Sequence, residues 1–481
     1  MGEDRSSLPI LSAMQLHRIL ALFAYGIAPA VAAGAITIDH ADSFGAGVIV
    51  GVAVFLVNQG LTRNRYPLHL MPLASVIVRG LSPVIGAGVG ILVLDAAGHS
   101  IAAEALVAPI VGAWAVTAFA AFAKAPLESA RPIRIALIGS PYIAVGLDQE
   151  LKMAKFRSYK VVGWIADKTG PTTEPGDGPR RLGALDQVRQ VVVTHQVDLL
   201  VHSSRPAAGD GDAPFPSRLE LFERVATDCL DTKVKLIEVG QLYEELLGHV
   251  PLGQSNAAWF QYLLHPRYRP GSSFSKRTFD ILIGGTMLIM LSPFLAAFAL
   301  AVKLTDGGPV FYRQRRVGER GREFELVKLR SMRVDSEDRG PAWAAADDDR
   351  ITKVGKLMRR LHVDEMPQLI NILRGEMTLV GPRPERQEII SRLERQLVYY
   401  DRRHLVKPGL AGWAQARCGY GGSDEGTGWK LCHDLFYLKH RSMYFDALIL
   451  IENVRVSVSG KVQFGVRAPQ KEFIIGEVEV G

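Results

Sequence analysis

Cysteine is scarce in this sequence. Its 481 residues include three cysteines, Cys229, Cys418 and Cys432. These are too few for a disulfide framework and lack the paired C-x-x-C spacing of a zinc site, so they favour a reducing compartment. Hydrophobic residues make up 48% of the chain and charged residues 22%, which excludes a disordered tail protein and a fibrous protein.

Lysine and arginine are absent from residues 19–61. Two apolar runs, 19–38 and 44–61, fill this stretch, and two more follow at 77–94 and 101–123. Each approaches the roughly 20 residues that a helix needs to cross the hydrocarbon core of a bilayer. The first run is no signal peptide, because no small-residue cleavage pattern follows it and three similar runs come after it. The first 130 residues therefore predict a membrane bundle of four transmembrane helices.

The charges between these runs predict their orientation. Under the positive-inside rule, the basic segments lie in the cytoplasm and the acidic segments lie across the membrane. Both ends of the four-helix unit are then cytoplasmic, in a multi-pass membrane protein. The basic residues are Arg5, Arg18, Arg63, Arg65, Lys124, Arg131 and Arg134, and the acidic residues are Asp39, Asp42 and Asp95.

Residues 131–264 show the alternation of strands and helices that is typical of a parallel α/β sheet. The dinucleotide fingerprint G-x-G-x-x-G is absent, because Gly139 at the end of the first strand is followed by Ser140-Pro-Tyr142. We therefore expect a Rossmann-like domain with a structural or regulatory role, and a nucleotide-type ligand is the alternative. The predicted strands are 134–139, 161–165, 197–202 and 234–239, and 184–194 is a predicted helix.

A fifth apolar run, residues 278–303, differs from the others because basic residues flank both of its ends. Such flanks conflict with a simple crossing of the membrane. Ser292-Pro293 interrupts the run near its middle, and proline kinks a helix by removing one hydrogen bond. A re-entrant helix, broken near Pro293, that enters the membrane and returns resolves the conflict; a plain kinked transmembrane helix is the alternative. Asp280 would then lie at the interface, where Lys276 or Arg277 can neutralise it.

Positive charge is concentrated in the C-terminal part of the chain. The net charge is +7, and residues 265–481 alone carry 35 basic and 26 acidic residues. Nucleic acid, an anionic membrane surface and phosphate-bearing substrates are all compatible with this excess. Here the adjacent carboxylates Asp364 and Glu365 follow a basic stretch, and Arg383 stands in a rigid Gly-Pro-Arg-Pro turn. Cations can neutralise phosphate oxygens while carboxylates hold Mg²⁺ or act as a nucleophile; the alternative is a solvated helix surface.

Ordered motifs strengthen the case for a chemical site. Roughly residues 270–465 resemble the bacterial sugar transferases, the monotopic polyprenol-phosphate phosphoglycosyl transferases. The N-terminal half is more loosely similar to the long-form members, which prime exopolysaccharide or O-antigen assembly. Leu329 departs from the pattern, since an aromatic residue is usual between the Lys and Arg of that motif. The matching stretches are Lys276–Asp280, Ser292-Pro293, Gly308–Gly318, Lys328–Met332, Asp349–Gly355, Arg359, Asp364–Gln368, Asn371, Gly375, Met377–Pro384 and Lys407–Gln415.

The resemblance implies a reaction. Hexose-1-phosphate would pass from a UDP-sugar to undecaprenyl phosphate, with release of UMP. Asp364 would attack the sugar-bearing phosphate to form a covalent phosphosugar-aspartate, which the polyprenol phosphate then attacks. Asp364 and Glu365 would hold Mg²⁺. Lys328, Arg359 and Arg383 would clamp phosphate oxygens, and a structural ion pair is the alternative for the two arginines.

The resemblance also implies a location and a division of the chain. The protein would lie in the bacterial inner membrane, with its soluble and catalytic parts on the cytoplasmic side, against the lipid bilayer and not on nucleic acid. Three domains are expected, 1–130, 131–264 and a mostly helical catalytic domain at 265–481. Glucose is the first hypothesis for the sugar and galactose the second. The oligomeric state stays open, a homodimer included.

Two rival functions remain at this point. In the first, the chain is a catalytically silent membrane scaffold or regulator whose Rossmann-like domain senses a ligand. In the second, it is a sugar transferase that releases UDP in place of UMP. The nucleotide released by the protein separates all three hypotheses.

Overall fold

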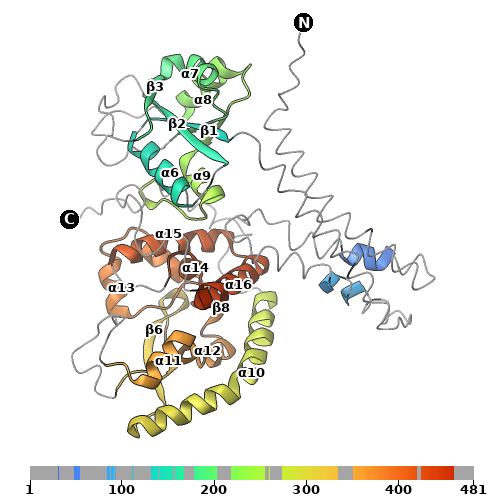
Figure 1. Ribbon diagram of the computed structural model, residues 1–481, viewed down its shortest axis with the longest axis vertical. Helices are drawn as coiled ribbons and strands as arrows, with labels where there is room; N and C mark the ends of the chain where they lie inside the picture. Colours follow the sequence, from blue (N-terminus) through green and yellow to red (C-terminus); the bar gives the residue numbers. More distant parts are fainter. Residues whose placement is uncertain are drawn as a thin grey trace. The chain divides into compact units, whose positions relative to one another are not determined.

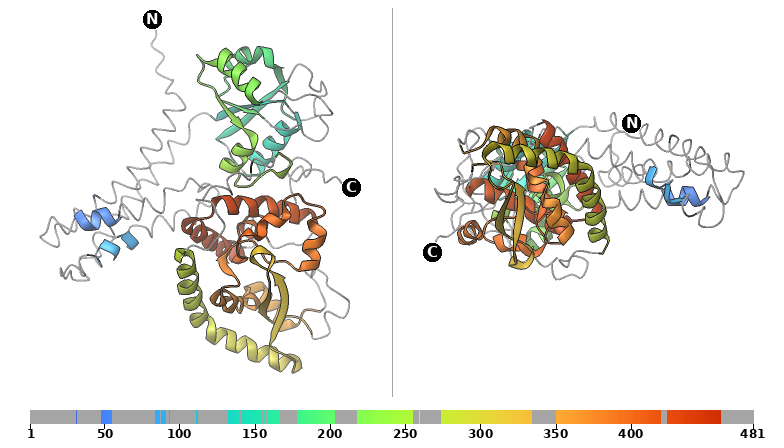
Figure 2. Two further views of the ribbon diagram at one scale, coloured as in Figure 1. Left: turned by 180° about the vertical axis from the view of Figure 1, so that it is seen from behind. Right: turned by 90° about the horizontal axis from the view of Figure 1, so that it is seen from below.

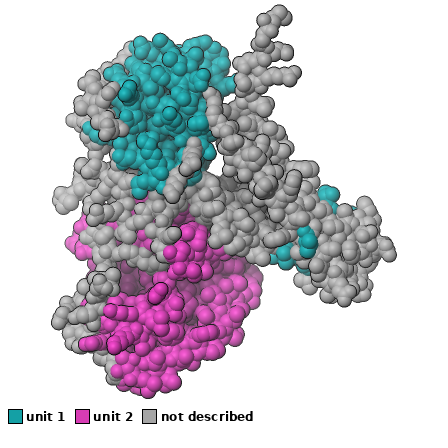
Figure 3. Space-filling view, viewed as in Figure 1, with its two compact units in different colours: residues 1–246 teal, residues 247–481 magenta. Residues whose placement is uncertain are grey.

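The computed structural model divides into two compact units, residues 1–246 and 247–481 (Figure 3). Most of the four predicted transmembrane runs lies outside the described residues, although the described pieces of the second and third runs are helical. The four crossings therefore stay a prediction. The structure describes residues 31, 48–54, 84–86, 88–90, 93, 111, 132–139, 141–154, 156, 158–166, 178–202, 218–254, 259, 274–333, 350–419 and 424–459.

Unit 1 contains the predicted parallel sheet. Its five strands run in the order β3-β2-β1-β4-β5, and every neighbouring pair is parallel. Helices connect the strands and bury an apolar core against them, which includes Ile138, Ile165 and Leu200 (Figure 1). The elements are β1 (Ile133–Ile138), α6 (Pro141–Met153), β2 (Tyr159–Ala166), β3 (Arg181–Ala184), α7 (Val188–Thr194), β4 (Leu199–His202), α8 (Arg218–Cys229), β5 (Lys235–Glu238) and α9 (Val239–Leu246).

The turn after β1 shows why this unit departs from a dinucleotide fingerprint. Gly139 has a φ of 106°, a conformation that glycine adopts without the steric cost of a Cβ atom. Pro141 is the first residue of α6, a position where its missing N–H breaks no helical hydrogen bond. That N–H is therefore not available to a phosphate at the start of the helix.

Unit 2 is mostly helical, as predicted, with two small sheets. An antiparallel hairpin joins β6 to β7, and β8 pairs with β9 in parallel. Trp413, Phe436 and Phe445 are fully buried and pack against one another. The elements are α10 (Phe274–Asp306), β6 (Phe311–Val317), β7 (Glu323–Leu329), α11 (Lys353–Leu361), α12 (Gln368–Arg374), β8 (Thr378–Val380), α13 (Gln387–Leu393), β9 (Gly409–Ala411), α14 (Trp413–Cys418), α15 (Asp424–His440) and α16 (Met443–Ser459).

Unit 2 begins before the predicted boundary at residue 265. The Trp413 indole donates a hydrogen bond to the Gly248 carbonyl oxygen at 2.7 Å, and the Val250 amide donates to the Cys432 carbonyl oxygen at 3.0 Å. Residues 247–254 therefore pack with the C-terminal part rather than with the α/β sheet. The division into three domains itself stays a prediction.

The fifth apolar run forms most of α10, which is helical over 33 residues. Figures 1 and 2 show two arms that meet at a bend, and Pro293 lies inside the helix. The expected kink is present, but the expected break is not, because the helix continues through it. Ser292 explains this continuity: its hydroxyl donates at 2.8 Å to the Ile289 carbonyl oxygen, the acceptor that the missing Pro293 N–H leaves open.

Both arms of α10 are attached to unit 2. In the first arm, the Arg277 guanidinium donates to the carbonyl oxygens of Ile372 and Leu373, each at 2.6 Å, at the end of α12. In the second arm, Val302 packs against Leu329 and Met358. Between these anchors α10 exposes large apolar side chains, and Phe274–Thr305 is the one helix among the described residues that is long and apolar enough to cross a membrane. The exposed side chains include Ile281, Leu282, Ile289, Met290, Phe294 and Leu300.

A buried ionic cluster fixes the start of α10. Lys276 pairs with Asp446 at 2.5 Å and lies 3.8 Å from Asp280. Asp280 also accepts from the Thr378 hydroxyl at 2.7 Å and the Leu379 amide at 3.1 Å. The predicted neutralisation of Asp280 by Lys276 is thus present, while Arg277 has a different role at the end of α12. We call Lys276, Asp280, Asp446 and their partners the anchor cluster.

Candidate active site

The adjacent carboxylates stand just after α11, in a short 3₁₀ helix at Val363–Glu365. His362 makes the turn between the two helices in a left-handed conformation, with a φ of 55°. That reversal directs Asp364 and Glu365 inward, and each residue is 8% exposed. The pair is therefore part of the interior and not the solvated helix surface that the sequence left as an alternative. His362 serves the geometry of this turn.

α11 itself is placed by a close contact with the segment after β7. The Thr352 side chain caps the helix by accepting from the Gly355 amide at 2.9 Å. A Cβ atom at Gly355 would lie 1.9 Å from the Ser331 carbonyl oxygen. Only glycine permits this approach, so the Asp349–Gly355 motif sets the distance between α11 and the segment that carries Ser331.

Both carboxylate oxygens of Glu365 are paired with cations. Its Oε1 accepts from the Lys328 ammonium at 3.0 Å and from the Arg383 guanidinium at 2.6 Å, and its Oε2 lies 3.3 Å from the other Arg383 nitrogen. Burial would raise the pKa of the Glu365 carboxyl, but Arg383 and Lys328 outweigh it and hold the pKa well below its ordinary value. Glu365 is therefore a fixed anion that positions two cations.

Asp364 has the opposite environment. Among the described residues no hydrogen-bond donor lies on its carboxylate, although Lys328, Arg359 and His362 act on it electrostatically. Burial and the negative charge of Glu365 raise the pKa of Asp364 above its ordinary value. A carboxylate that is buried, weakly solvated and surrounded by positive charge retains free lone pairs for a ligand or an electrophile.

Lys328 and Arg359 are held by polar neighbours. The Asn371 side chain on α12 accepts from the Val327 amide at 3.1 Å and donates to the Glu325 carbonyl oxygen at 2.7 Å, which fixes the strand that carries Lys328. Burial lowers the pKa of the Lys328 ammonium. The Arg359 Nε donates to the Ser331 hydroxyl at 2.9 Å. Arg359 acts on Asp364 electrostatically, but its nearest hydrogen-bond partner among the described residues is Ser331 and not Asp364.

Arg383 is placed by tight backbone packing around its turn. Gly381 and Gly409 each donate across the turn, to the carbonyl oxygens of Ala411 and Pro382, both at 2.9 Å. A Cβ atom at Gly409 would lie 2.0 Å from the Gly381 nitrogen, so these two chain segments touch only because both residues are glycines. The Arg403 guanidinium then donates to the Arg383 carbonyl oxygen at 2.9 Å.

The five predicted site residues divide into two groups. Glu365, Lys328 and Arg383 form one cluster joined by ion pairs. In the described part of the chain, Asp364 and Arg359 make no ion pair with this cluster, and Arg359 donates a hydrogen bond to Ser331 instead. The predicted re-entrant residues Lys276, Arg277, Asp280, Ser292 and Pro293 lie apart from this cluster, in α10, where they anchor or bend the helix.

Comparison with known proteins decides the family. Residues 271–460 match the family model described as bacterial sugar transferase. A "UDP-glucose:undecaprenyl-phosphate glucose-1-phosphate transferase" of Caulobacter vibrioides is 35% identical over 241 residues, which cover 49% of this chain and 90% of the relative. The chain belongs to the bacterial sugar transferase family.

Two longer members of this family are also similar. A "UDP-N-acetylgalactosamine-undecaprenyl-phosphate N-acetylgalactosaminephosphotransferase" of Aeromonas hydrophila is 37% identical over 51% of this chain and 57% of its own length. A "UDP-glucose:undecaprenyl-phosphate glucose-1-phosphate transferase" of Escherichia coli is 40% identical over 37% of this chain and 39% of its own length. The chain thus matches about half the length of these two relatives.

The site suits a magnesium ion only together with a substrate. Among the described residues, no three His, Cys, Asp or Glu side chains group as metal ligands. Mg²⁺ is commonly bound by one or two carboxylates, substrate phosphates and water. Asp364 has lone pairs available for this, whereas both Glu365 oxygens already accept from cations. The donor set therefore fits an ion that arrives with a diphosphate, with Asp364 as the more accessible carboxylate. The acidic run at 347–349, whose sequence resembles the metal-binding D-x-D motif of other glycosyltransferases, lies outside the described residues.

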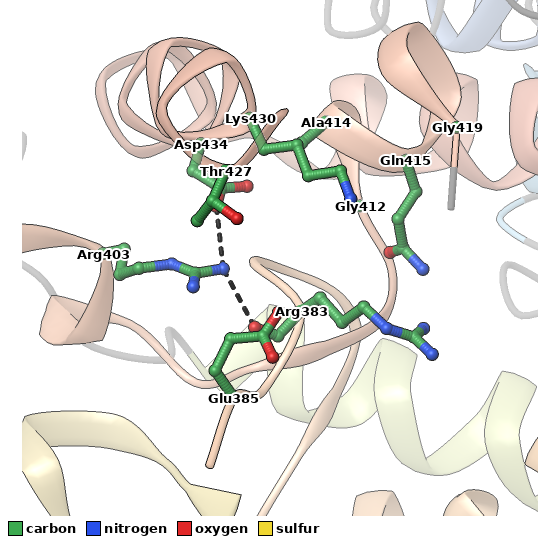
Figure 4. Close-up of a pocket in the computed structure, with 10 residues that line it drawn as sticks. All are labelled: Arg383, Glu385, Arg403, Gly412, Ala414, Gln415, Gly419, Thr427, Lys430 and Asp434. Carbon is green, nitrogen blue, oxygen red and sulfur yellow. Dashed lines mark hydrogen bonds and ion pairs between the residues drawn. The ribbon is translucent and has the colours of Figure 1, made fainter. Parts of the chain in front are cut away.

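A pocket beside Arg383 contains residues that the sequence did not single out for this site. Thr427, Lys430 and Asp434 of α15 converge there with Glu385 and Arg403 from two other segments (Figure 4). Arg403 pairs with Asp434 at 2.9 Å, and both side chains are buried. Spacing gives no signal for this convergence, because α15 meets the Arg383 turn only through the fold. Ser331 was similarly quoted within a motif without a role.

Proposed function

We propose that the protein transfers a sugar-1-phosphate from a UDP-sugar to undecaprenyl phosphate and releases UMP. The observation that carries this proposal is the unequal pair of neighbouring carboxylates. Glu365 is neutralised by Lys328 and Arg383, while Asp364 has no hydrogen-bond donor among the described residues. The names of the relatives support the same class of reaction.

In the first step, an Asp364 carboxylate oxygen attacks the phosphorus that bears the sugar. A bond forms between that oxygen and phosphorus, and the phosphoanhydride bond to the nucleotide breaks, so UMP leaves with the bridging oxygen. The raised pKa of Asp364 reflects a poorly solvated anion, which favours its reaction as a nucleophile.

In the second step, a phosphate oxygen of undecaprenyl phosphate attacks the same phosphorus. The bond to Asp364 breaks and returns the carboxylate, and the product is a sugar joined to the lipid through a diphosphate. Because the two phosphate substrates use Asp364 in turn, one cationic site serves both.

Positive charge around Asp364 stabilises both steps. Lys328 and Arg383 are held by Glu365 and face the same space, and Arg359 is oriented by Ser331. Fixed cations aimed at developing phosphate charge lower the barrier without reorganisation. Mg²⁺, if bound, would be held by Asp364 together with the substrate and would supply positive charge that neutralises the diphosphate.

We further propose that α10 is re-entrant. Both of its arms pack on unit 2, at Arg277 and at Val302, while Ile289, Met290 and Phe294 near the bend are exposed. A helix that crossed the membrane would carry its second end to the opposite side, away from the core that Val302 joins. The lipid phosphate would then meet the soluble nucleotide sugar at the surface of the bilayer.

The remaining parts of the chain fit a membrane-anchored member of the family. The strand order of unit 1 matches the first five strands of a doubly wound sheet, which supports a Rossmann-like domain without the glycine fingerprint. We propose four transmembrane helices before it, in the bacterial inner membrane, with both soluble parts on the cytoplasmic side.

The test is transfer by the purified full-length protein in lipid nanodiscs. With undecaprenyl phosphate, Mg²⁺ and UDP-glucose, we expect UMP release and a lipid-linked sugar. UDP-galactose and UDP-N-acetylgalactosamine complete the panel, because one relative is named for the latter sugar. Without the lipid acceptor, radiolabelled sugar should stay on the protein through Asp364.

Other outcomes separate the rival functions. Release of UDP would identify the other class of transferase, and no nucleotide release with any donor would favour a scaffold. UMP release without a labelled protein, even after rapid quenching, would indicate direct transfer between the two substrates.

A further inference from the structure

The pocket beside Arg383 contains a buried side chain whose polar atoms are unused. Gln415 in α14 is 2% exposed, and among the described residues neither its Oε1 nor its Nε2 has a hydrogen-bond partner. A buried polar atom that is left unpaired loses the hydrogen bonds that it makes to water in the unfolded chain, which destabilises the folded protein. An amide with both atoms unpaired is therefore a costly arrangement unless a ligand completes it.

The chain keeps space for this amide. A Cβ atom at Gly412 would lie 2.9 Å from the Gln415 Oε1 and 2.8 Å from the Gly381 carbonyl oxygen. Gly412, Ala414 and Gly419 line the same pocket, so small residues surround the carboxamide. Figure 4 shows Gln415 and Lys430 pointing into the space beside Arg383.

Arg383 connects this pocket to the carboxylate pair. Its guanidinium binds Glu365, and its side chain also lines the pocket. A ligand with its diphosphate near Asp364 and Arg383 can extend directly into the space below Gln415. The pocket is thus placed for a group attached to one end of that diphosphate.

We propose that Gln415 binds the uracil ring of the nucleotide through two parallel hydrogen bonds. A carboxamide offers one donor and one acceptor side by side. The imide edge of uracil offers the complement, an N3–H donor next to a carbonyl acceptor. A hexose carries hydroxyl groups instead, which do not require this paired pattern. The small residues Gly412, Ala414 and Gly419 line the pocket around the carboxamide, and Lys430 adds positive charge to it.

This inference rests on the proposed function, since it assigns the nucleotide end of the same substrate. The experiment is calorimetric titration of the full-length protein in nanodiscs with UMP and with N3-methyl-UMP, which lacks the imide donor. We expect wild-type protein to bind UMP about ten-fold more tightly. In Gln415→Met that preference should fall to near one, because the side chain keeps its length and loses both polar atoms.

Two further variants control for folding and for surface effects. Gln415→Glu keeps an acceptor for the N3–H and removes the donor to the neighbouring carbonyl oxygen, so it should weaken the binding of both nucleotides and keep the preference for UMP. Gln387→Met changes an exposed glutamine that bonds only to Ser391 among the described residues and should keep the wild-type preference. Thermal unfolding verifies that each variant is folded.

Several results would overturn the assignment. One is an unchanged preference for UMP in Gln415→Met. Another is an equal loss of binding for inorganic diphosphate, which would make the pocket a phosphate site. A third is a changed choice between UDP-glucose and UDP-galactose with the base preference intact, which would make it a sugar site. If the wild-type protein transfers sugar phosphate but Gln415→Met keeps the preference for UMP, only this inference is refuted. If the protein prefers UMP through Gln415 but releases no UMP from any UDP-sugar, only the proposed transferase function is refuted.

Discussion

Two buried groups of acids and bases in unit 2 are built from the same residue types and differ in how completely they are paired. In the anchor cluster, Asp280 accepts from Thr378 and Leu379 and lies near Lys276. In the candidate active site, Glu365 is paired in the same way, but Asp364 beside it has no donor among the described residues. A buried carboxylate whose oxygens accept hydrogen bonds from fixed donors stabilises the fold. A buried carboxylate without such donors is available for a reaction.

The difference has an energetic basis. Burying a charged group costs free energy, and hydrogen bonds with fixed partners offset that cost. Asp280 receives these bonds from β8, which is continuous with the core. Asp364 receives only longer-range attraction, so its pKa is raised where that of Glu365 is lowered. Stability is therefore lower than it would be with a neutral residue at position 364.

The largest expected effect comes from Asp364→Asn. Transfer should fall by about a thousand-fold or more, because the amide is not a nucleophile. The free energy of unfolding should stay the same or rise, because a neutral side chain of the same shape removes the cost of burying the charge. UMP release and thermal unfolding measure the two quantities.

Asp401→Asn is the matched control for this variant. Asp401 also stands in a 3₁₀ helix of unit 2, Tyr400–Leu405, but it is exposed and lies 3.6 Å from Arg402. We expect normal transfer from it. Substantial transfer by Asp364→Asn, or a large loss of its stability, would show that position 364 belongs with the anchor cluster.

The second prediction tests the anchor cluster in the opposite way. Asp280→Ala should lower the free energy of unfolding by about 3 kcal/mol, because it leaves the Thr378 hydroxyl and the Leu379 amide without their buried acceptor. At a temperature where the variant is folded, transfer per folded molecule should be close to normal. Urea unfolding monitored by tryptophan fluorescence measures the loss.

Glu388→Ala provides the contrast for Asp280→Ala. Glu388 is exposed and lies 3.5 Å from Arg386, an arrangement worth about 0–1 kcal/mol. A loss of stability as small as this in Asp280→Ala would mean that the anchor cluster does not hold the start of α10.

The two groups were not equally predictable from the sequence. The motif order predicts Asp364, Glu365, Lys328 and Arg383 as site residues, and the fold brings them together. It does not predict which carboxylate is paired, because that depends on residues 37 positions before and 18 positions after Glu365. Asp280 was expected to meet Lys276, four residues away, but its bonds to Thr378 and Leu379 depend on tertiary structure.

The fold shows the same limit. The sequence pattern predicts four of the five strands of unit 1, and each predicted segment overlaps an observed strand. The short edge strand β3, Arg181–Ala184, was missed because four residues of mixed polarity carry no alternation. Pro293 predicts a kink in α10, yet the helix remains continuous because the Ser292 hydroxyl replaces a lost donor. The Gln415 pocket has no sequence signal, since α14 and α15 form it only with the Arg383 turn.

The smallest expected effect is in Glu365→Gln, which removes the paired carboxylate without removing the nucleophile. Transfer should fall by about 10- to 100-fold, because Lys328 and Arg383 lose the group that positions them. The negative charge of Glu365 is, after burial, the cause that raises the pKa of Asp364. Without that charge the pKa of Asp364 falls, so the nucleophile stays ionised to lower pH.

The pH profile of kcat/KM tests the coupling between the two carboxylates directly. Activity requires ionised Asp364, so it declines on the acid side as pH drops through the Asp364 pKa. In Glu365→Gln this acid limb should move to lower pH, while in Glu394→Gln, an exposed acid at the end of α13, it should stay in place. A limb that moves to higher pH would mean that Glu365 has a net stabilising effect on the ionised form of Asp364. The cations that Glu365 holds in place, Lys328 and Arg383, would then attract the Asp364 charge more strongly than the Glu365 charge repels it. The two carboxylates would then act as a single ionised pair. The contrast between one carboxylate with hydrogen-bond donors and one without them would no longer describe the site.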